Sequence, residues 1–168
     1  MESEQAIERV HPPAWLMRLL NPVTRRVLGS RLHTFASGAL LLLHYRGRRT
    51  GRTYTVPAGY HWIDGQLSVL TNSGWRHNFA GPGPDIDVTY RGQRRHASAH
   101  LVSDPDTVAT IYHDMITDLG VQQAQRRLGI RINVDRVPTH DELREAIVRS
   151  ELSVVRIDLR EPSGGSDE

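Results

Sequence analysis

The stretch of sequence that decides the fold covers residues 40–62 and reads LLLLHYRGRRTGRTYTVPAGYHW. Two runs rich in apolar, β-branched and aromatic residues, 40–45 and 53–62, stand on either side of a turn bounded by Gly47 and Gly51. Strand-forming runs joined by a short glycine-containing segment are typical of a β-hairpin. The sequence therefore predicts two antiparallel strands with a basic loop between them.

Further runs of strand-forming residues follow this hairpin. Most are separated by tight-turn residues such as Asp64-Gly65, Gly81 to Pro84 and Arg91-Gly92. Strands are predicted at 66–71, 85–90, 93–102 and 152–159. Short strands joined by tight turns favour an antiparallel meander of about six strands, and closing it into a barrel removes exposed edges.

A helical period replaces strand alternation beyond residue 102. Asp104 before Pro105 is typical of an N-cap followed by proline at the first helical position. Thr139 and Glu142 have the spacing of a capping box. Helices are predicted at 105–119, 121–128 and 140–150. The expected fold class is therefore mainly β with helices, of the α+β type.

Both ends of the chain differ from this central region. Residues 1–12 are polar and are expected to form a disordered leader, and residues 162–168 a disordered tail. One domain is expected over residues 13–161. Within it, residues 13–32 have helical spacing interrupted at Asn21-Pro22, which predicts two short helices packed over one end of the barrel. A basic helix lying on a membrane surface is the alternative.

Composition excludes several classes of protein. The chain has 168 residues and no cysteine, so disulfides, thiolate nucleophiles and cysteine-bound metals are excluded. All 21 basic residues are arginine, which excludes lysine Schiff-base chemistry and favours bidentate contacts to phosphates and carboxylates. The sequence contains no apolar run of membrane-spanning length and no basic-then-apolar signal at its start, so a cytoplasmic location is expected.

The hairpin loop Gly47-Arg48-Arg49-Thr50-Gly51-Arg52 is the strongest candidate for chemistry. Glycines let the backbone expose its N–H groups, and the arginines and the threonine hydroxyl supply donors for phosphate or carboxylate oxygens. An ordinary solvated turn is the alternative.

The segment Thr71-Asn72-Ser73-Gly74-Trp75 is the second candidate. Its small residues would let a planar ring approach the backbone, and Trp75 would cover or flank that ring. The alternative is a connection to a helix with Asn72 or Ser73 as its cap.

Taken together, these segments resemble the deazaflavin-dependent nitroreductase and F420H2-dependent quinone reductase family. The resemblance covers residues 40–102: the basic hairpin, the strand with Pro57, the small-residue turn, and then Trp75 to Phe79 and Pro84. It implies a split β-barrel, similar to FMN-binding barrels, in which the hairpin holds the phosphate and oligoglutamate tail of coenzyme F420. The small-residue turn and the strand with the proline would lie against the deazaflavin ring. The cofactor-binding residues implied are Arg48, Arg49, Thr50, Gly51, Arg52, Val56, Pro57, Thr71, Asn72, Ser73, Gly74, Trp75 and Asn78.

The chain departs from the family pattern at two positions and in the length of one segment. Family members often carry arginine where this chain has Tyr54 and lysine where it has Ser73, and the segment from Gly74 to Asn78 is shorter than usual. Loss of these cations weakens the expected anion site. Arg52 and Arg76 are the candidates to replace them.

The resemblance implies an oxidoreductase that transfers a hydride from reduced F420 to a small electron-poor acceptor such as a quinone, nitro compound or enone. Alternatives are an FMN-dependent enzyme of the same fold and a non-catalytic flavin-binding module. A nucleic-acid partner is not expected, because the arginine clusters lack interleaved aromatics.

No catalytic side chain is assigned with a defined role. Tyr112 is the candidate proton donor, although it shares a helical face with Val108, Ile111 and Met115 and a core position is favoured. No histidine set has metal-ligand spacing, so no metal site is predicted.

Overall fold

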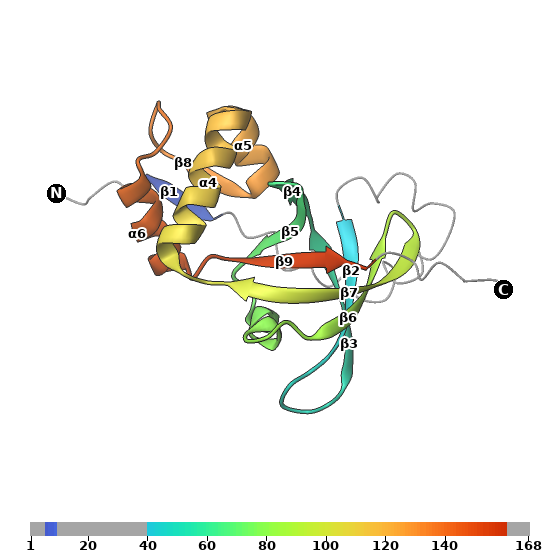
Figure 1. Cartoon of the computed structure of the whole chain (residues 1–168). Coiled ribbons are helices and arrows are strands. Elements are labelled where there is room, and N and C mark those ends of the chain that lie inside the picture. Colours follow the sequence, from blue (N-terminus) through green and yellow to red (C-terminus); the bar gives the residue numbers. More distant parts are fainter. Residues whose placement is uncertain (1–5, 10–39, 161–168) are drawn as a thin grey trace, which may run out of the picture.

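The computed structural model describes residues 6–9 and 40–160 (Figure 1). In chain order the strands are β1 (Ile7–Arg9), β2 (Leu40–Arg46), β3 (Thr53–Gly59), β4 (His61–Ile63), β5 (Gln66–Thr71), β6 (Asp85–Tyr90), β7 (Gln93–Val102), β8 (Ile130–Ile132) and β9 (Ser153–Leu159). The helices are the 3-10 helix η1 (Gly74–Phe79) and the α-helices α4 (Pro105–Leu119), α5 (Val121–Leu128) and α6 (His140–Ser150). The helices predicted at 105–119, 121–128 and 140–150 are therefore confirmed, as is the mainly β composition with helices.

Seven of the described strands form one antiparallel sheet in the order β3-β2-β6-β7-β9-β5-β4. Strands β3 and β4 occupy its two edges, yet only Tyr60 separates them in the sequence. A single residue spans only about 3.3–3.6 Å, so the sheet must curl until its two edges meet at this corner. Figure 1 shows the curled sheet that results. The expected split barrel is confirmed.

The order of the strands corrects the expected meander. Three hairpins, β2-β3, β4-β5 and β6-β7, are each formed by neighbours in the sequence, but β2 pairs with β6 and β5 pairs with β9. The final strand thus inserts between β7 and β5 instead of adding to the end of a meander. In this position β9 has a hydrogen-bonded strand along each of its edges and joins the two halves of the sheet.

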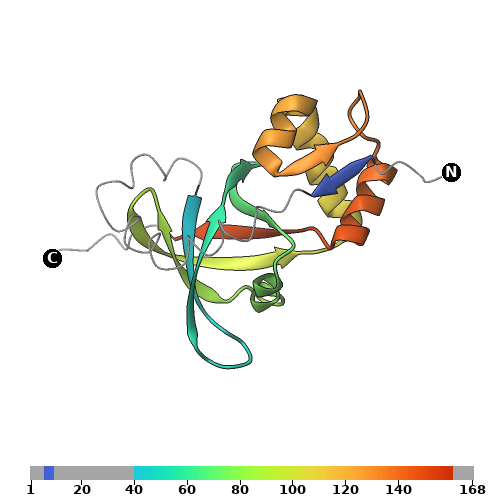
Figure 2. The ribbon, with the colours of Figure 1, turned by 180° about the vertical axis from the view of Figure 1, so that it is seen from behind.

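The described residues form two hydrophobic cores. One core fills the inside of the curl and includes Leu43, Phe79 and Val155. The other packs α4, α5 and α6 around Tyr112 and Ile116. Figures 1 and 2 both show these helices gathered at one end of the sheet, away from the loop of the β2-β3 hairpin.

Strand β1 corrects the expectation of a disordered leader over residues 1–12. Residues 7–9 pair antiparallel with β8, and Ile7 is 3% exposed within the helical core. A three-residue strand has too few positions to establish a period, so sequence patterning could not detect either β1 or β8. The helices expected within residues 13–32 and the tail at 162–168 lie outside the described residues.

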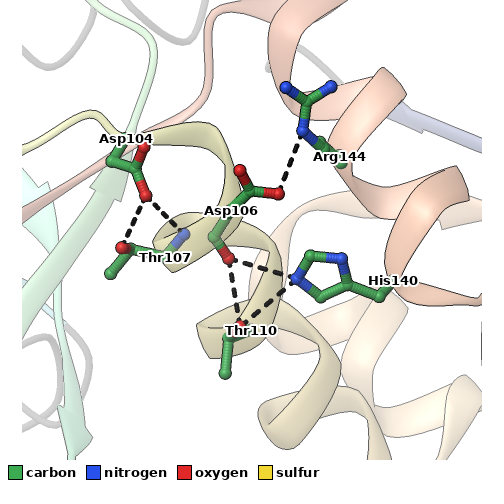
Figure 3. Close-up of polar contacts among 6 residues, drawn as sticks. All are labelled: Asp104, Asp106, Thr107, Thr110, His140 and Arg144. Carbon is green, nitrogen blue, oxygen red and sulfur yellow. Dashed lines mark hydrogen bonds and ion pairs between the residues drawn. The ribbon is translucent and has the colours of Figure 1, made fainter.

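Polar contacts between helices hold the helical end together (Figure 3). Asp104 caps α4 by accepting from the Thr107 backbone N–H at 2.9 Å, as predicted. Asp106 then pairs with Arg144 of α6 at 3.0 Å. The predicted capping box between Thr139 and Glu142 is also present at the start of α6. In the described residues no helix has the length and apolarity needed to cross a membrane.

Candidate functional site

The β2-β3 hairpin ends in a compact loop closed by backbone hydrogen bonds. The Gly47 N–H donates to the Arg52 carbonyl at 2.8 Å, and the Gly51 N–H donates to the Gly47 carbonyl at 2.9 Å. Gly51 has a φ of 65°, a left-handed conformation that favours glycine. The predicted glycine boundaries therefore shape the loop directly.

This loop is hydrogen-bonded to η1, about thirty residues later in the chain. The Arg48 backbone N–H donates to Asn78 Oδ1 at 3.0 Å, and the Asn78 amide donates to the Trp75 carbonyl at 2.8 Å. The Arg48 guanidinium donates to the carbonyls of His77 at 3.2 Å and Ala80 at 3.3 Å. Arg48 thus joins the two segments that the sequence analysis singled out.

An open pocket of about 610 Å³ lies between the loop and η1. Its size falls within the roughly 300–1,000 Å³ typical of small-molecule sites. The lining residues are Tyr45, Gly47, Arg49, Thr50, Tyr54, Trp75 and Asn78. Aromatic, basic and neutral polar residues therefore line the same space.

The pocket's aromatic side chains form a connected wall. The rings of Tyr45 and Tyr54 stack with centroids 5.6 Å apart and an interplanar angle of 24°. Phe79 lies edge-on to both Tyr45 and Trp75, with centroid distances of 5.2 and 5.8 Å. Burial raises the pKa of the Tyr45 phenol, and the neighbouring Tyr54 raises it further. Tyr45 consequently stays protonated at neutral pH and can only act as a neutral hydrogen-bonding group.

Tyr54 is held in this wall by its neighbours. A Cβ atom on Gly47 would lie 2.7 Å from Tyr54 Cε2, so the ring occupies the space that a side chain at position 47 would need. The Tyr54 hydroxyl lies 3.3 Å from the Thr50 hydroxyl, which also accepts from the Arg52 backbone N–H at 3.3 Å. The ring is therefore held on the hairpin side of the pocket.

The small-residue turn before η1 is organised by buried Arg76. Its guanidinium donates to the carbonyls of Asn72 at 2.7 Å and Ser73 at 3.0 Å, and lies 3.4 Å from Glu151. The Asn72 amide donates to the Ser150 carbonyl, and Thr71 Oγ1 accepts from the Ser73 backbone N–H. Arg76 is thus occupied within the fold, and the expectation that it replaces a missing cation at the anion site is wrong.

The structure brings some of the sequence-predicted site residues together and separates others. Arg49, Thr50, Trp75 and Asn78 line the pocket. Gly51 and Arg48 shape and fasten the loop, and Arg52 is exposed beside it. Val56 and Pro57 lie in edge strand β3, where Val56 packs on the core inside the curl. Thr71, Asn72 and Ser73 make structural contacts, and exposed Gly74 has open space around its Cβ position.

The sequence did not suggest Tyr45 as a pocket residue, and it marked position 54 only as a place where relatives carry arginine, without predicting the aromatic pair. Leu41, Leu43 and Tyr45 alternate towards the core inside the curl, and the hairpin register places Tyr45 directly opposite Tyr54. Side chains of paired strand residues lie on the same face of a sheet. The alternation of apolar residues in β2 indicates that Tyr45 faces the core, and the length of the loop sets the hairpin register that places Tyr54 opposite it. These two features of the sequence could have identified both residues.

Tyr112 lies away from the pocket. It is 1% exposed on α4 and belongs to the helical core, and it is not among the pocket's lining residues. The core position that helical spacing favoured is confirmed. The described residues contain no cluster of three or more histidine or acidic side chains arranged to hold a metal ion.

A curled antiparallel sheet with helices at one end and an open aromatic pocket beside the basic hairpin defines a split β-barrel. The chain belongs to the F420H(2)-dependent quinone reductase family, whose sequence profile matches residues 16–136. It is therefore a member of a family of F420-dependent oxidoreductases, as the resemblance implied.

Solved structures with a similar arrangement come from several bacteria. A conserved hypothetical protein of Mycobacterium tuberculosis is 18% identical with a TM-score of 0.42, over 79% of this chain and 81% of that one. The heme storage protein of Vibrio cholerae is 12% identical with a TM-score of 0.42, over 85% and 92%. An FAD and heme binding protein of Mycobacterium smegmatis is 17% identical with a TM-score of 0.40, over 83% and 75%. No curated protein sequence matches the chain.

Proposed function

We propose that this protein is an oxidoreductase that binds coenzyme F420 and passes a hydride from its reduced form to a quinone-class acceptor. The observation that carries the proposal is the family match, because residues 16–136 include every residue that lines the pocket. Nitro compounds and enones are electron-poor acceptors of the same kind and belong to the same proposal.

The chemistry of the pocket fits a planar ring with an anionic group attached. Tyr54 and Trp75 supply aromatic surface, and Arg49 supplies a guanidinium suited to a phosphate oxygen. Thr50 and Asn78 add neutral polar groups. Because no carboxylate is among the lining residues, nothing in the described lining repels an anion.

The roles of the chain's own residues follow from this arrangement. When bound, a reduced deazaflavin supplies a hydride from its C5 carbon. Arg49 and Thr50 would hold the anionic group, and Trp75 and Tyr54 would restrict the position of the ring. Arg48 and Asn78 keep the loop at a constant distance from η1. The protein's contribution is thus to orient the reacting groups, which lowers the barrier without a reactive side chain.

Two titrations and one kinetic assay test the proposal. The purified protein is titrated separately with F420 and with FMN, and bound F420 is followed by its own fluorescence. Oxidation of reduced F420 is then measured against a panel of quinones, nitro compounds and enones. We expect F420 to bind and its reduced form to be oxidised in a quinone-dependent manner, with an isotope effect when C5 carries deuterium.

The other outcomes decide between the alternatives. Binding of FMN without binding of F420 would replace the proposal with an FMN-dependent enzyme of the same fold. Binding of F420 without acceptor-dependent oxidation would replace it with a non-catalytic binding module. Matched titrations of Arg49→Ala and Arg46→Ala identify the site, because Arg46 lies on the face of β2 opposite to Tyr45.

A further inference from the structure

We infer that a second pocket, between helix α5 and strand β8, is a binding site for a phosphate group. Its described lining residues are Gln122, Gln125, Arg126, Ile130 and Arg131, and none of these lines the pocket beside the β2-β3 hairpin. Figures 1 and 2 both show α5 at the helical end of the molecule, away from the hairpin loop. The site is therefore distinct from the one to which we assign F420, and its occupation does not depend on that assignment.

The end of α5 brings the lining residues together. The helix ends at Gly129, which has a φ of 64°, and the chain passes directly into β8 at Ile130. Gln122, Gln125 and Arg126 have the i, i+3 and i+4 spacing of neighbours on one helical face. A pocket of about 470 Å³ lies between this face and β8, a size within the roughly 300–1,000 Å³ typical of small-molecule sites.

Hydrogen bonding fixes the orientation of the Gln125 amide. Its Oε1 accepts from the backbone N–H of Ile132 in β8 at 2.9 Å. A backbone N–H can only donate, so the oxygen of the side-chain amide must be the atom that faces it. Because β8 occupies this oxygen, the group that Gln125 has left to offer a ligand is its NH2, a hydrogen-bond donor.

The two arginines supply donors and positive charge from different elements. Arg126 lies in the last turn of α5, and Arg131 lies in β8. Arg131 also lies 3.6 Å from Glu8, but these side chains are 60% and 59% exposed, so the ion pair is weak and leaves other guanidinium N–H groups available. The C-terminal end of a helix carries partial negative charge, so the guanidinium groups, and not the helix dipole, would hold an anion here.

The chemistry of the lining favours an anion with several acceptor oxygens. Guanidinium groups have no acceptor atom, and the oxygen of Gln125 is already engaged. A phosphate group carries a charge of about −1.5 to −2 and directs its oxygens to several sides, so donors on a helix and on a strand can reach it together. A carboxylate has two oxygens in one plane and a single charge. From two charge-assisted contacts by exposed side chains we expect a dissociation constant on the order of 0.1–1 mM.

Inorganic phosphate is the probe for this site. It is titrated at constant pH and ionic strength into the isotope-labelled full chain, and the backbone amide signals are followed by NMR. We expect the signals of residues 122–132 to shift and to saturate with a dissociation constant in this range. The signals of residues 46–52 report separately on phosphate bound beside the hairpin, so the failure of either site is distinguishable from the failure of the other.

Arg126→Gln and Arg127→Gln form a matched pair. Each removes one charge from an exposed position in the last turn of α5, but Arg126 lines the pocket and Arg127 is not among its described lining residues. Arg126→Gln should weaken phosphate binding about fivefold or more, whereas Arg127→Gln should weaken it less than about twofold.

Gln125→Glu tests the oriented amide. The variant keeps an oxygen for the Ile132 N–H and replaces the NH2 by a negatively charged oxygen, so it should weaken phosphate binding about tenfold or more. The remaining amide signals of each variant check that the fold is retained.

Vesicles identify the source of the phosphate group. Co-sedimentation is measured with vesicles of phosphatidylcholine alone and with vesicles that also contain phosphatidic acid, whose headgroup is a phosphate monoester. Binding to the second kind alone, weakened by Arg126→Gln but not by Arg127→Gln, would assign the site to a lipid headgroup. Saturable phosphate binding without vesicle binding would assign it to a soluble phosphate.

Two results would overturn the assignment of this site. One is a lack of saturable shifts in residues 122–132 at phosphate concentrations up to about 10 mM. The other is an equal loss of binding in Arg126→Gln and Arg127→Gln, which would show a diffuse basic surface without a defined site.

Discussion

Replacing Arg76 by alanine should destabilise the protein, because this buried side chain holds together the turn beside the pocket. Arg76 is only 6% exposed, and its guanidinium connects the turn at Asn72 and Ser73 to Glu151. Removal of the side chain leaves the Asn72 carbonyl without this donor. The Ser73 carbonyl keeps the backbone N–H of residue 76 as a donor at 3.1 Å.

The size of the effect follows from these contacts. A charge-assisted hydrogen bond contributes roughly 1.5–3 kcal/mol, and the shorter bond, to Asn72 at 2.7 Å, should count in full. The bond to Ser73 counts for less because its acceptor keeps a partner. Glu151 is 76% exposed, so its ion pair contributes about 0–0.5 kcal/mol. The expected loss in the free energy of unfolding is therefore about 2–4 kcal/mol.

Urea unfolding monitored by tryptophan fluorescence measures this loss. Arg76→Met retains most of the aliphatic volume and should lose nearly as much stability as alanine, because the hydrogen bonds dominate. Glu151→Gln removes only the exposed charge and should cost less than about 0.5 kcal/mol. Because Trp75 and Asn78 belong to the same 3-10 helix, F420 binding should weaken in the Arg76 variants. A loss below about 0.5 kcal/mol in Arg76→Ala would refute the reasoning.

Three further predictions follow from other contacts. Ile7→Ala should lower the free energy of unfolding by about 2 kcal/mol, because Ile7 is 3% exposed in the helical core; unchanged urea unfolding would show that β1 adds no stability. Gly47→Ala should displace Tyr54 and cost about 1–3 kcal/mol in the same assay, whereas Gly74→Ala, with nothing within 4 Å of its Cβ position, should leave stability unchanged; equal melting of the two would contradict this. A hydrogen bond from Arg136, together with the backbone N–H of the helix cap, lowers the pKa of Glu142 from 4.5 to about 2. This carboxylate therefore stabilises the fold above pH 4.5 and loses that effect as the pH falls towards 2. Glu142→Gln should accordingly cost about 1 kcal/mol at neutral pH and flatten the acid limb of a pH-dependent unfolding series; parallel curves for variant and parent would oppose the assignment.

Much of the local structure could be predicted from the sequence because local rules govern it. Strands β5, β6 and β7 and helices α4, α5 and α6 have the predicted bounds. Their ends are set by residues close in the sequence: Asp104 before the proline of α4, the capping box of α6, and Gly129 in a left-handed conformation after α5. The basic hairpin between Gly47 and Gly51 could also be predicted, because its turn residues and arginines are close together in the sequence. The resemblance to the family rests on the same local segment.

Pairing between distant segments was decided only by the tertiary structure. Strand β9 inserts between β5 and β7, and β1 pairs with β8. These pairings depend on which apolar faces can be buried together, and the sequence of a short strand does not specify its partner. The orientation of the arginine side chains in the hairpin is likewise set by contacts with segments outside the hairpin. Arg48 turns to carbonyls of the segment around η1, whereas Arg49 faces the pocket, although the two are neighbours of identical type. Residue type placed several hydrogen-bond donors in this loop, whereas the contacts with η1 determined which of the two neighbouring arginines lines the pocket.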